Sequence, residues 1–106
     1  MKIASITLPY LPSSIAHKAV ALSAGHIIIT EHLKQVHGGY TRLAADGAWV
    51  ASSSTLFYER VYRYEFACKD NEQEQSELRA LAFRVKTRTD EQSIMVVHAN
   101  GEVEFI

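Results

Sequence analysis

The sequence contains a single cysteine, Cys68, and only two prolines among its 106 residues. One cysteine excludes an internal disulfide and any metal site built from several cysteines, and it favours a reducing compartment. The apolar runs are a few residues long, whereas a membrane-spanning helix needs about 20 apolar residues. The beginning of the chain also lacks the pattern of a secretory signal. We therefore expect a cytoplasmic protein with Cys68 packed in its interior.

The sequence also lacks an excess of charge, because 11 Lys and Arg stand against 12 Asp and Glu. Non-specific binding to nucleic acid draws its affinity from several Lys or Arg side chains, so nucleic acid is not expected as the main partner. The hydrophobic share of 47% and the charged share of 22% are typical of globular proteins. The length fits one domain, and we expect residues 1–106 to form it.

The first part of the chain predicts a strand followed by helical segments. A β-branched stretch at residues 2–8 ends before a proline, which favours a strand. Residues 13–25 predict a helix that begins with a serine cap and ends at Gly25. The β-branched run at residues 27–29 favours extended chain, and a second short helix is expected over residues 30–37.

The rest of the chain predicts two hairpins, a long strand and a helix. Asp46-Gly47 indicates a two-residue turn that places Trp49 opposite Ala44, and residues 56–68 alternate as a half-buried strand does. A helix capped by Asp70 or Asn71 follows. Asn100-Gly101 then predicts a hairpin in which His98 pairs with Val103. The order indicates an α+β fold with an antiparallel sheet and two or three helices, most simply a ferredoxin-like sandwich.

The histidines give no support to a metal site, and no cofactor is expected. No two of them are three or four residues apart on a helix, and no cysteine pair completes a set. His32 and His37 point about 140° apart on a helix of 3.6 residues per turn.

His98 is the histidine of most interest, because the expected hairpin places it on an apolar face. A lone histidine near a turn is more often a rim residue than a general base. No triad or carboxylate pair is readable from local spacing, so no catalytic residue is assigned. Glu59 with His98 is kept as the alternative catalytic pair of a small hydrolase or nuclease.

Aromatic residues suggest two kinds of contact. The row of Tyr58, Tyr62, Tyr64 and Phe66 could stack RNA bases if it were exposed, so single-stranded RNA binding is a further alternative. The row is the only strongly apolar face of its strand, and we expect it to pack against the helices. The candidate residues for binding a partner are Arg42, Trp49 and Phe83.

Several short motifs resemble small phage-borne and bacterial proteins of uncharacterised function. The motifs are Gly38-Gly39-Tyr40-Thr41, Gly47-Ala48-Trp49, Glu59 before Val61-Tyr62-Arg63-Tyr64, and Thr89-Asp90-Glu91-Gln92-Ser93. The resemblance covers residues 30–106, and Ser52-Ser53-Ser54 replaces the usual glycine after the tryptophan. It implies a compact α+β sandwich in a phage or mobile-element setting, and no catalytic residue is carried over.

These observations predict a non-enzymatic protein-binding module, an accessory protein that acts on a host protein. The enzyme and RNA-binding alternatives stay open beside it. A homodimer is also expected, because Phe105 and Ile106 lie near the edge of the last strand, where pairing across a two-fold axis would bury them. Glu102 and Glu104 on the same segment argue against such pairing.

Overall fold

The computed structural model describes residues 1–10, 16–50 and 53–106. In chain order the elements are β1 (Lys2–Pro9), α1 (Ala16–His37), β2 (Thr41–Val50), β3 (Leu56–Cys68), α2 (Glu72–Thr89), β4 (Met95–Val97) and β5 (Val103–Phe105). Within the described residues, neither helix combines the length and the hydropathy needed to cross a membrane.

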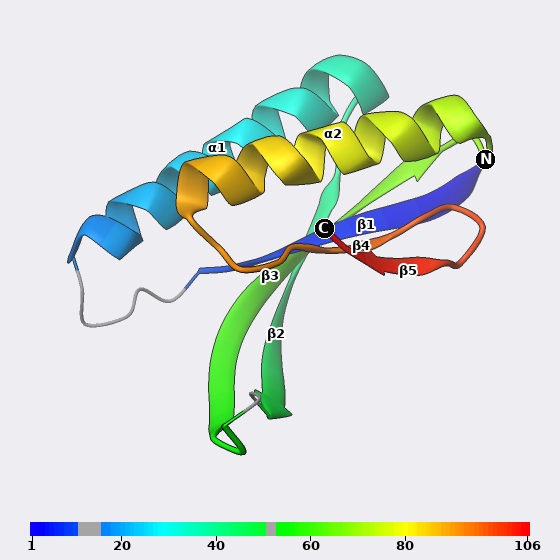
Figure 1. The fold of residues 1–106 in the computed structure, drawn as a ribbon. Helices are drawn as coiled ribbons and strands as arrows, with labels where there is room; N and C mark the ends of the chain where they lie inside the picture. The colour runs from blue at the N-terminus through cyan, green and yellow to red at the C-terminus, as the bar shows by residue number, and fades with distance from the viewer. Residues whose placement is uncertain (11–15, 51–52) are drawn as a thin grey trace.

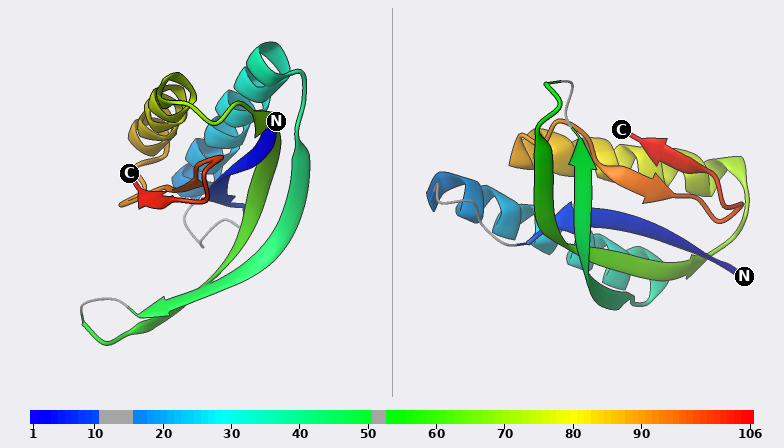
Figure 2. Two further views of the ribbon diagram at one scale, coloured as in Figure 1. Left: turned by 90° about the vertical axis from the view of Figure 1, so that its right-hand side faces the viewer. Right: turned by 90° about the horizontal axis from the view of Figure 1, so that it is seen from below.

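The strands form one antiparallel sheet in the order β2-β3-β1-β4-β5, and both helices cover the same face of it (Figure 1). The first four strands have the order of a ferredoxin-like sandwich, and β5 extends one edge. The α+β class with an antiparallel sheet is therefore confirmed. The outer halves of β2 and β3 run past the helices and curve beneath β4 and β5, on the face that the helices leave open (Figure 2, left).

The core lies between the sheet and the helices, on the faces that the residue pattern predicts. Ile6 and Leu8 of β1 are fully buried, and Tyr64 of β3 is 1% exposed. The expected cap of α2 is confirmed, because the Asn71 side chain accepts a hydrogen bond from the Glu74 backbone N–H at 2.9 Å. The buried stripe of this helix is formed by Leu78, Leu81, Ala82 and Val85. Cys68 is buried as expected.

The first helical segment is one helix of 22 residues, so the predicted break is wrong. Gly25 does not end α1, and its missing side chain instead allows a close approach to α2 and β1. A Cβ atom built there would lie 2.5 Å from the Thr89 methyl group and 2.9 Å from a Leu8 methyl group. Tertiary packing has overridden the local preference for extended chain at residues 27–29. The serine cap expected at the start of the helix lies outside the described residues.

The predicted turn at Asp46-Gly47 is also wrong, because β2 continues through both residues. Gly47 pairs with Glu59 and Trp49 with Phe57, so the chain reverses only after Val50. The long strand β3 pairs with β2 over all ten residues of β2. This ladder of backbone hydrogen bonds outweighs the local turn preference of Asp-Gly.

β4 and β5 pair one residue out of the predicted register. Val97 rather than His98 lies opposite Val103, and the backbone N–H of His98 donates to the Glu102 carbonyl at 2.8 Å. A shift of one residue turns every side chain of a strand to the other face. Phe105 therefore lies on the open face at 68% exposure, whereas Ile106 packs against the core. Phe105 and Ile106 therefore do not share one patch, and the homodimer stays a prediction.

Candidate functional site

The open face of the sheet carries a groove of about 600 Å³ beneath the curved part of β2 and β3. Its walls come from β1, β2, β3, β4, β5 and the segment after α2. The residues that line it are Thr7, Pro9, Ala45, Asp46, Gly47, Ala48, Glu59, Val61, Arg63, Glu91, Ser93, Met95 and Phe105. The bend of the hairpin makes this face concave, because its outer half turns back toward the short strands (Figure 2).

Glu59 is one of the charged residues that line the groove. It lies on β3, and its Oε2 atom is buried without a hydrogen-bond partner among the described residues. Burial raises the pKa of the Glu59 carboxyl group, and the nearby Glu91 raises it further, while Lys18 opposes the shift. A buried carboxylate without a partner is unfavourable in the empty protein, and it offers a strong site for a cation or a donor.

Lys18 and Glu91 hold the acidic side of the groove in place. The Lys18 ammonium lies 3.0 Å from a Glu91 carboxylate oxygen, and it donates a hydrogen bond to the Thr89 carbonyl at 2.7 Å. These contacts join the N-terminal part of α1 to the segment that follows α2. Lys18 is engaged by Glu91 and Thr89, and within the described part of the chain it forms no ion pair with Glu59. The charge near Glu59 therefore favours a positively charged ligand.

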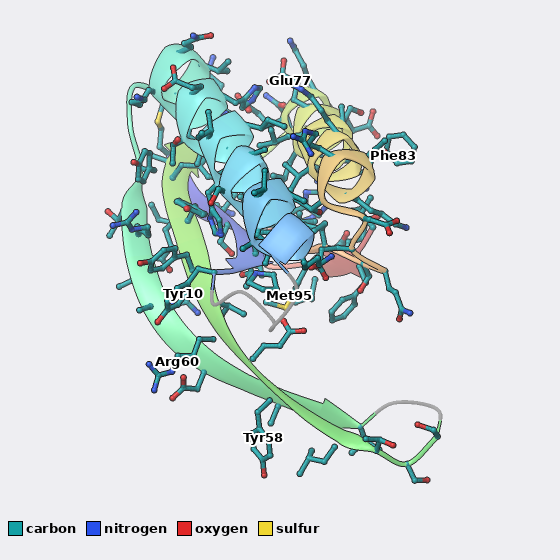
Figure 3. The ribbon with its side chains drawn as sticks, turned by 90° about the vertical axis from the view of Figure 1, so that its left-hand side faces the viewer. Tyr10, Tyr58, Arg60, Glu77, Phe83 and Met95 are labelled. Carbon is teal, nitrogen blue, oxygen red and sulfur yellow. The ribbon has the colours of Figure 1, made fainter. Side chains whose placement is uncertain are left out.

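The rest of the groove is mixed in character. Thr7 of β1 has a buried hydroxyl oxygen that also lacks a partner among the described residues. Val61, Met95 and Phe105 supply apolar surface, and Met95 lies on the open side of the sheet in Figure 3. Arg63 lies four residues from Glu59 on the same face of β3, about 13 Å away along the strand. The groove thus has acidic, apolar and basic parts.

The structure does not bring Glu59 and His98 together. Glu59 lines the groove on the open face, whereas His98 is 1% exposed on the helix side of the sheet. His98 Nε2 lies 2.6 Å from a Glu104 carboxylate oxygen, and the Arg79 guanidinium donates to the same oxygen at 2.8 Å. The alternative catalytic pair therefore does not form, and His98 has a structural role instead.

Of the candidate binding residues Arg42, Trp49 and Phe83, the structure places Arg42 on β2 and Phe83 on the outer side of α2, so these two do not share one surface. The Arg42 guanidinium lies 4.4 Å from the centre of the Tyr62 ring. The side chain of Trp49 lies outside what the structure describes. Phe83 is 63% exposed and points away from the sheet on the outer side of α2 (Figure 3).

The aromatic row packs against the helices over most of its length, as the pattern predicts. Tyr64 and Phe66 are buried. The His26 ring of α1 lies between Tyr64 and the C-terminal end of β1. Its Nδ1 is 2.6 Å from the Tyr64 hydroxyl, and its Nε2 is 2.7 Å from the Pro9 carbonyl. Tyr58 lies beyond the helices and is 77% exposed (Figure 3). The row is therefore not a platform for stacking RNA bases.

Thr7, Arg63, Glu91 and Met95 were missed as groove residues in the sequence. The alternation on β3 did place Glu59 and Arg63 on one face. Their convergence with residues of β1 and β4 depends on the strand order and on the bend of the hairpin, neither of which has a local signal.

Fold and site together define a ferredoxin-like α+β domain with a partly acidic groove on its open sheet face. No protein-family model and no curated protein matches the chain. Two solved structures match it over 98% of its length. One is a phage SAM lyase in complex with S-methyl-5'-thioadenosine, with a TM-score of 0.69, 15% identity and 87% of that chain covered. The other is a phage SAM lyase in the apo state, with a TM-score of 0.65, 14% identity and 86% covered.

These comparisons contradict the prediction of a non-enzymatic protein-binding module that acts on a host protein. The proteins that share the fold are described as a lyase, and the bound partner in one of them is a small molecule. The alternatives of a hydrolase, a nuclease or an RNA-binding domain gain no support from them. At these identities the likeness establishes the shared fold.

Proposed function

We propose that this protein is an enzyme that binds S-adenosylmethionine in the groove and cleaves it to S-methyl-5'-thioadenosine. The likeness to phage SAM lyase extends over 98% of the chain and supports this assignment. A phage setting, expected from the sequence motifs, fits it. The cytoplasm fits as the place of action, because a lone buried cysteine suits a reducing compartment.

The observation that carries the proposal is the Glu59 carboxyl group in an acidic part of the groove, whose buried Oε2 atom has no hydrogen-bond partner among the described residues. S-adenosylmethionine has a sulfonium and an ammonium group, and both are cationic. A sulfonium beside Glu59 supplies a positive charge next to its carboxyl group, and it also lowers the pKa of that group. Val61, Met95 and Phe105 offer apolar surface for the adenine ring.

The reaction breaks the bond between sulfur and the four-carbon amino acid part of the substrate. The bonding electrons stay on sulfur, which becomes a neutral thioether in S-methyl-5'-thioadenosine. The carboxylate oxygen of the same four-carbon fragment attacks the carbon that sulfur leaves and closes a five-membered lactone, so no water is consumed and no proton is released. Glu59 holds and orients the sulfonium in this scheme, and the walls of the groove exclude water from it.

The test is to incubate the purified protein with S-adenosylmethionine and to quantify S-methyl-5'-thioadenosine by chromatography. We expect product well above the uncatalysed breakdown of the substrate. Glu59→Gln should lower kcat/KM by about a hundredfold or more, as the loss of a buried charged contact to the reacting group does. Glu102→Gln, which changes an exposed carboxylate outside the groove, is the matched control. Equal, background-level product from all three proteins overturns the proposal.

A further inference from the structure

A cluster of metal-binding side chain types lies where the end of α1 meets the beginning of α2. His37 is the last residue of α1, and Glu74 and Glu77 lie in the first turns of α2. One ligand atom from each of the three lies within 4.8 Å of the other two. Glu77 is labelled on α2 in Figure 3, where the two helices lie side by side. The cluster is on the helix side of the sheet, away from the groove.

The His37 ring is held in place by its surroundings. Its side chain is 7% exposed, and its ring centre lies 4.6 Å from that of Phe66. The ring of His32, from the preceding part of α1, lies 6.0 Å from it between centres. A second imidazole is therefore close enough to supply a fourth ligand after a change of rotamer. A ring held by packing loses little side-chain entropy when it binds an ion.

The separations suit closure around a small divalent ion. Two ligands of a tetrahedral zinc ion at about 2.1 Å lie about 3.4 Å apart. The His37 Nε2 and Glu74 Oε2 atoms are 4.0 Å apart, which is longer than a hydrogen bond and needs only a small closure. Glutamate side chains have three rotatable bonds and can make this movement without any shift of the backbone.

We propose that His37, Glu74 and Glu77 bind a zinc ion that ties the C-terminal end of α1 to the first turns of α2. Nitrogen and carboxylate oxygen ligands suit zinc, and the two negative charges balance its double positive charge. His32 or a water molecule completes the tetrahedron. The spacing along α1 alone gave no hint of this site, because two of its three ligands come from the other helix. The proposal is independent of the proposed enzymatic function.

The first experiment is a zinc titration by calorimetry of protein without a histidine tag, after dialysis against a chelator. We expect one zinc ion per chain and a Tm that rises with zinc concentration. Magnesium should produce neither effect, since it prefers octahedral oxygen sites. Cobalt(II) should give the intense visible absorption of tetrahedral coordination.

Variants then assign the ligands. Glu77→Gln should weaken zinc binding at least about tenfold, as the loss of one ligand does. Glu72 lies on the same helix but outside the cluster, so Glu72→Gln is the matched control, and this variant should bind zinc as tightly as the wild type. His37→Gln removes the contact with Phe66, so circular dichroism must first establish that this variant is folded. An absence of zinc uptake by the wild type, or unchanged zinc affinity in Glu77→Gln, overturns the proposal.

Discussion

At the scale of single residues, the Glu59 carboxyl group makes the stability of the fold depend on pH. Burial raises the pKa of its carboxyl group, so the folded protein holds the proton to a higher pH than the unfolded chain does. Above the unfolded pKa, near 4.3, this difference costs folding free energy, and below it the cost disappears. Glu59→Gln should therefore be more stable than the wild type at neutral pH, and the gap should close as the pH falls toward 4.

Urea denaturation from about pH 8 to about pH 4 measures the difference in unfolding free energy between Glu59→Gln and the wild type. Glu102→Gln serves as the control, since its side chain is exposed and its substitution should change stability little at any pH. A Glu59→Gln variant that is less stable than the wild type throughout would mean that the carboxyl group has a hydrogen-bond or ion-pair partner within the protein.

His26 gives the opposite dependence on pH. Its pKa is lowered, first by burial and then by Arg42, while its hydrogen bond to Pro9 opposes the shift. Because the pKa of His26 is lower in the folded protein than the unfolded value of 6.5, folding stability is highest above pH 6.5. This stability is lost as the pH falls from 6.5 through the pKa of the folded state. We expect the wild-type Tm to fall below about pH 6.5.

His26→Gln should have a lower Tm at pH 7.5 because it loses two hydrogen bonds, and its Tm should vary less with pH in this range. His32 also has a lowered pKa and contributes to the dependence of Tm on pH. The Tm of the double variant His26→Gln, His32→Gln should therefore vary even less with pH. If Tm depends on pH equally in His26→Gln and in the wild type, His26 is not the cause of the fall in Tm at acidic pH.

At the scale of elements, Gly25 fixes how closely α1 packs on α2 and β1. Gly25→Ala gains about 1 kcal/mol in helix propensity, but its methyl group meets Thr89 and Leu8 below van der Waals distance. Overpacking of a well-filled core costs about 1–3 kcal/mol, so the variant should be less stable on balance. Ser23→Ala, an exposed change in the same helix, should be neutral or slightly stabilising. Thermal unfolding of both variants shows whether each substitution lowers or raises stability.

The same elements explain which parts of the fold could be predicted from the sequence. Clear residue periodicity predicts the strands β1 and β3 and the helix α2, and a cap residue marks the start of α2. The structure has all three elements where the pattern indicates. Gly25 and Asp46-Gly47 are local stop and turn signals that tertiary packing overrides, because a long partner strand and a close helix contact contribute more than a turn preference. The shift between β4 and β5 depends on one extra loop residue, Ala99, on the β4 side of the turn, which the residue pattern does not reveal.

At the scale of the whole molecule, the groove exists because of topology. Thr7, Glu59 and Met95 are more than thirty residues apart in the sequence, and they meet because β1 lies between β3 and β4. Glu59 was identified in the sequence as a candidate, but with the wrong partner, since the face of His98 depended on a register that proved to be shifted. Spacing along the chain finds sites on one element, and this site is assembled from five strands and a loop.

The assembled groove should distinguish ligands by charge at one position. Sinefungin has an ammonium group where S-adenosylmethionine has its sulfonium, whereas S-adenosylhomocysteine has a neutral thioether there. Neither compound has a sulfonium that the proposed reaction could cleave. Because Glu59 and Glu91 border the groove, sinefungin should bind about tenfold more tightly, which corresponds to about 1.4 kcal/mol. The difference should shrink in Glu59→Gln, and it should persist at high salt if the contact is buried, since buried charges are screened little. Calorimetric titration of both compounds into both proteins measures this, and equal affinities in the wild type would exclude Glu59 as the group that receives the sulfonium.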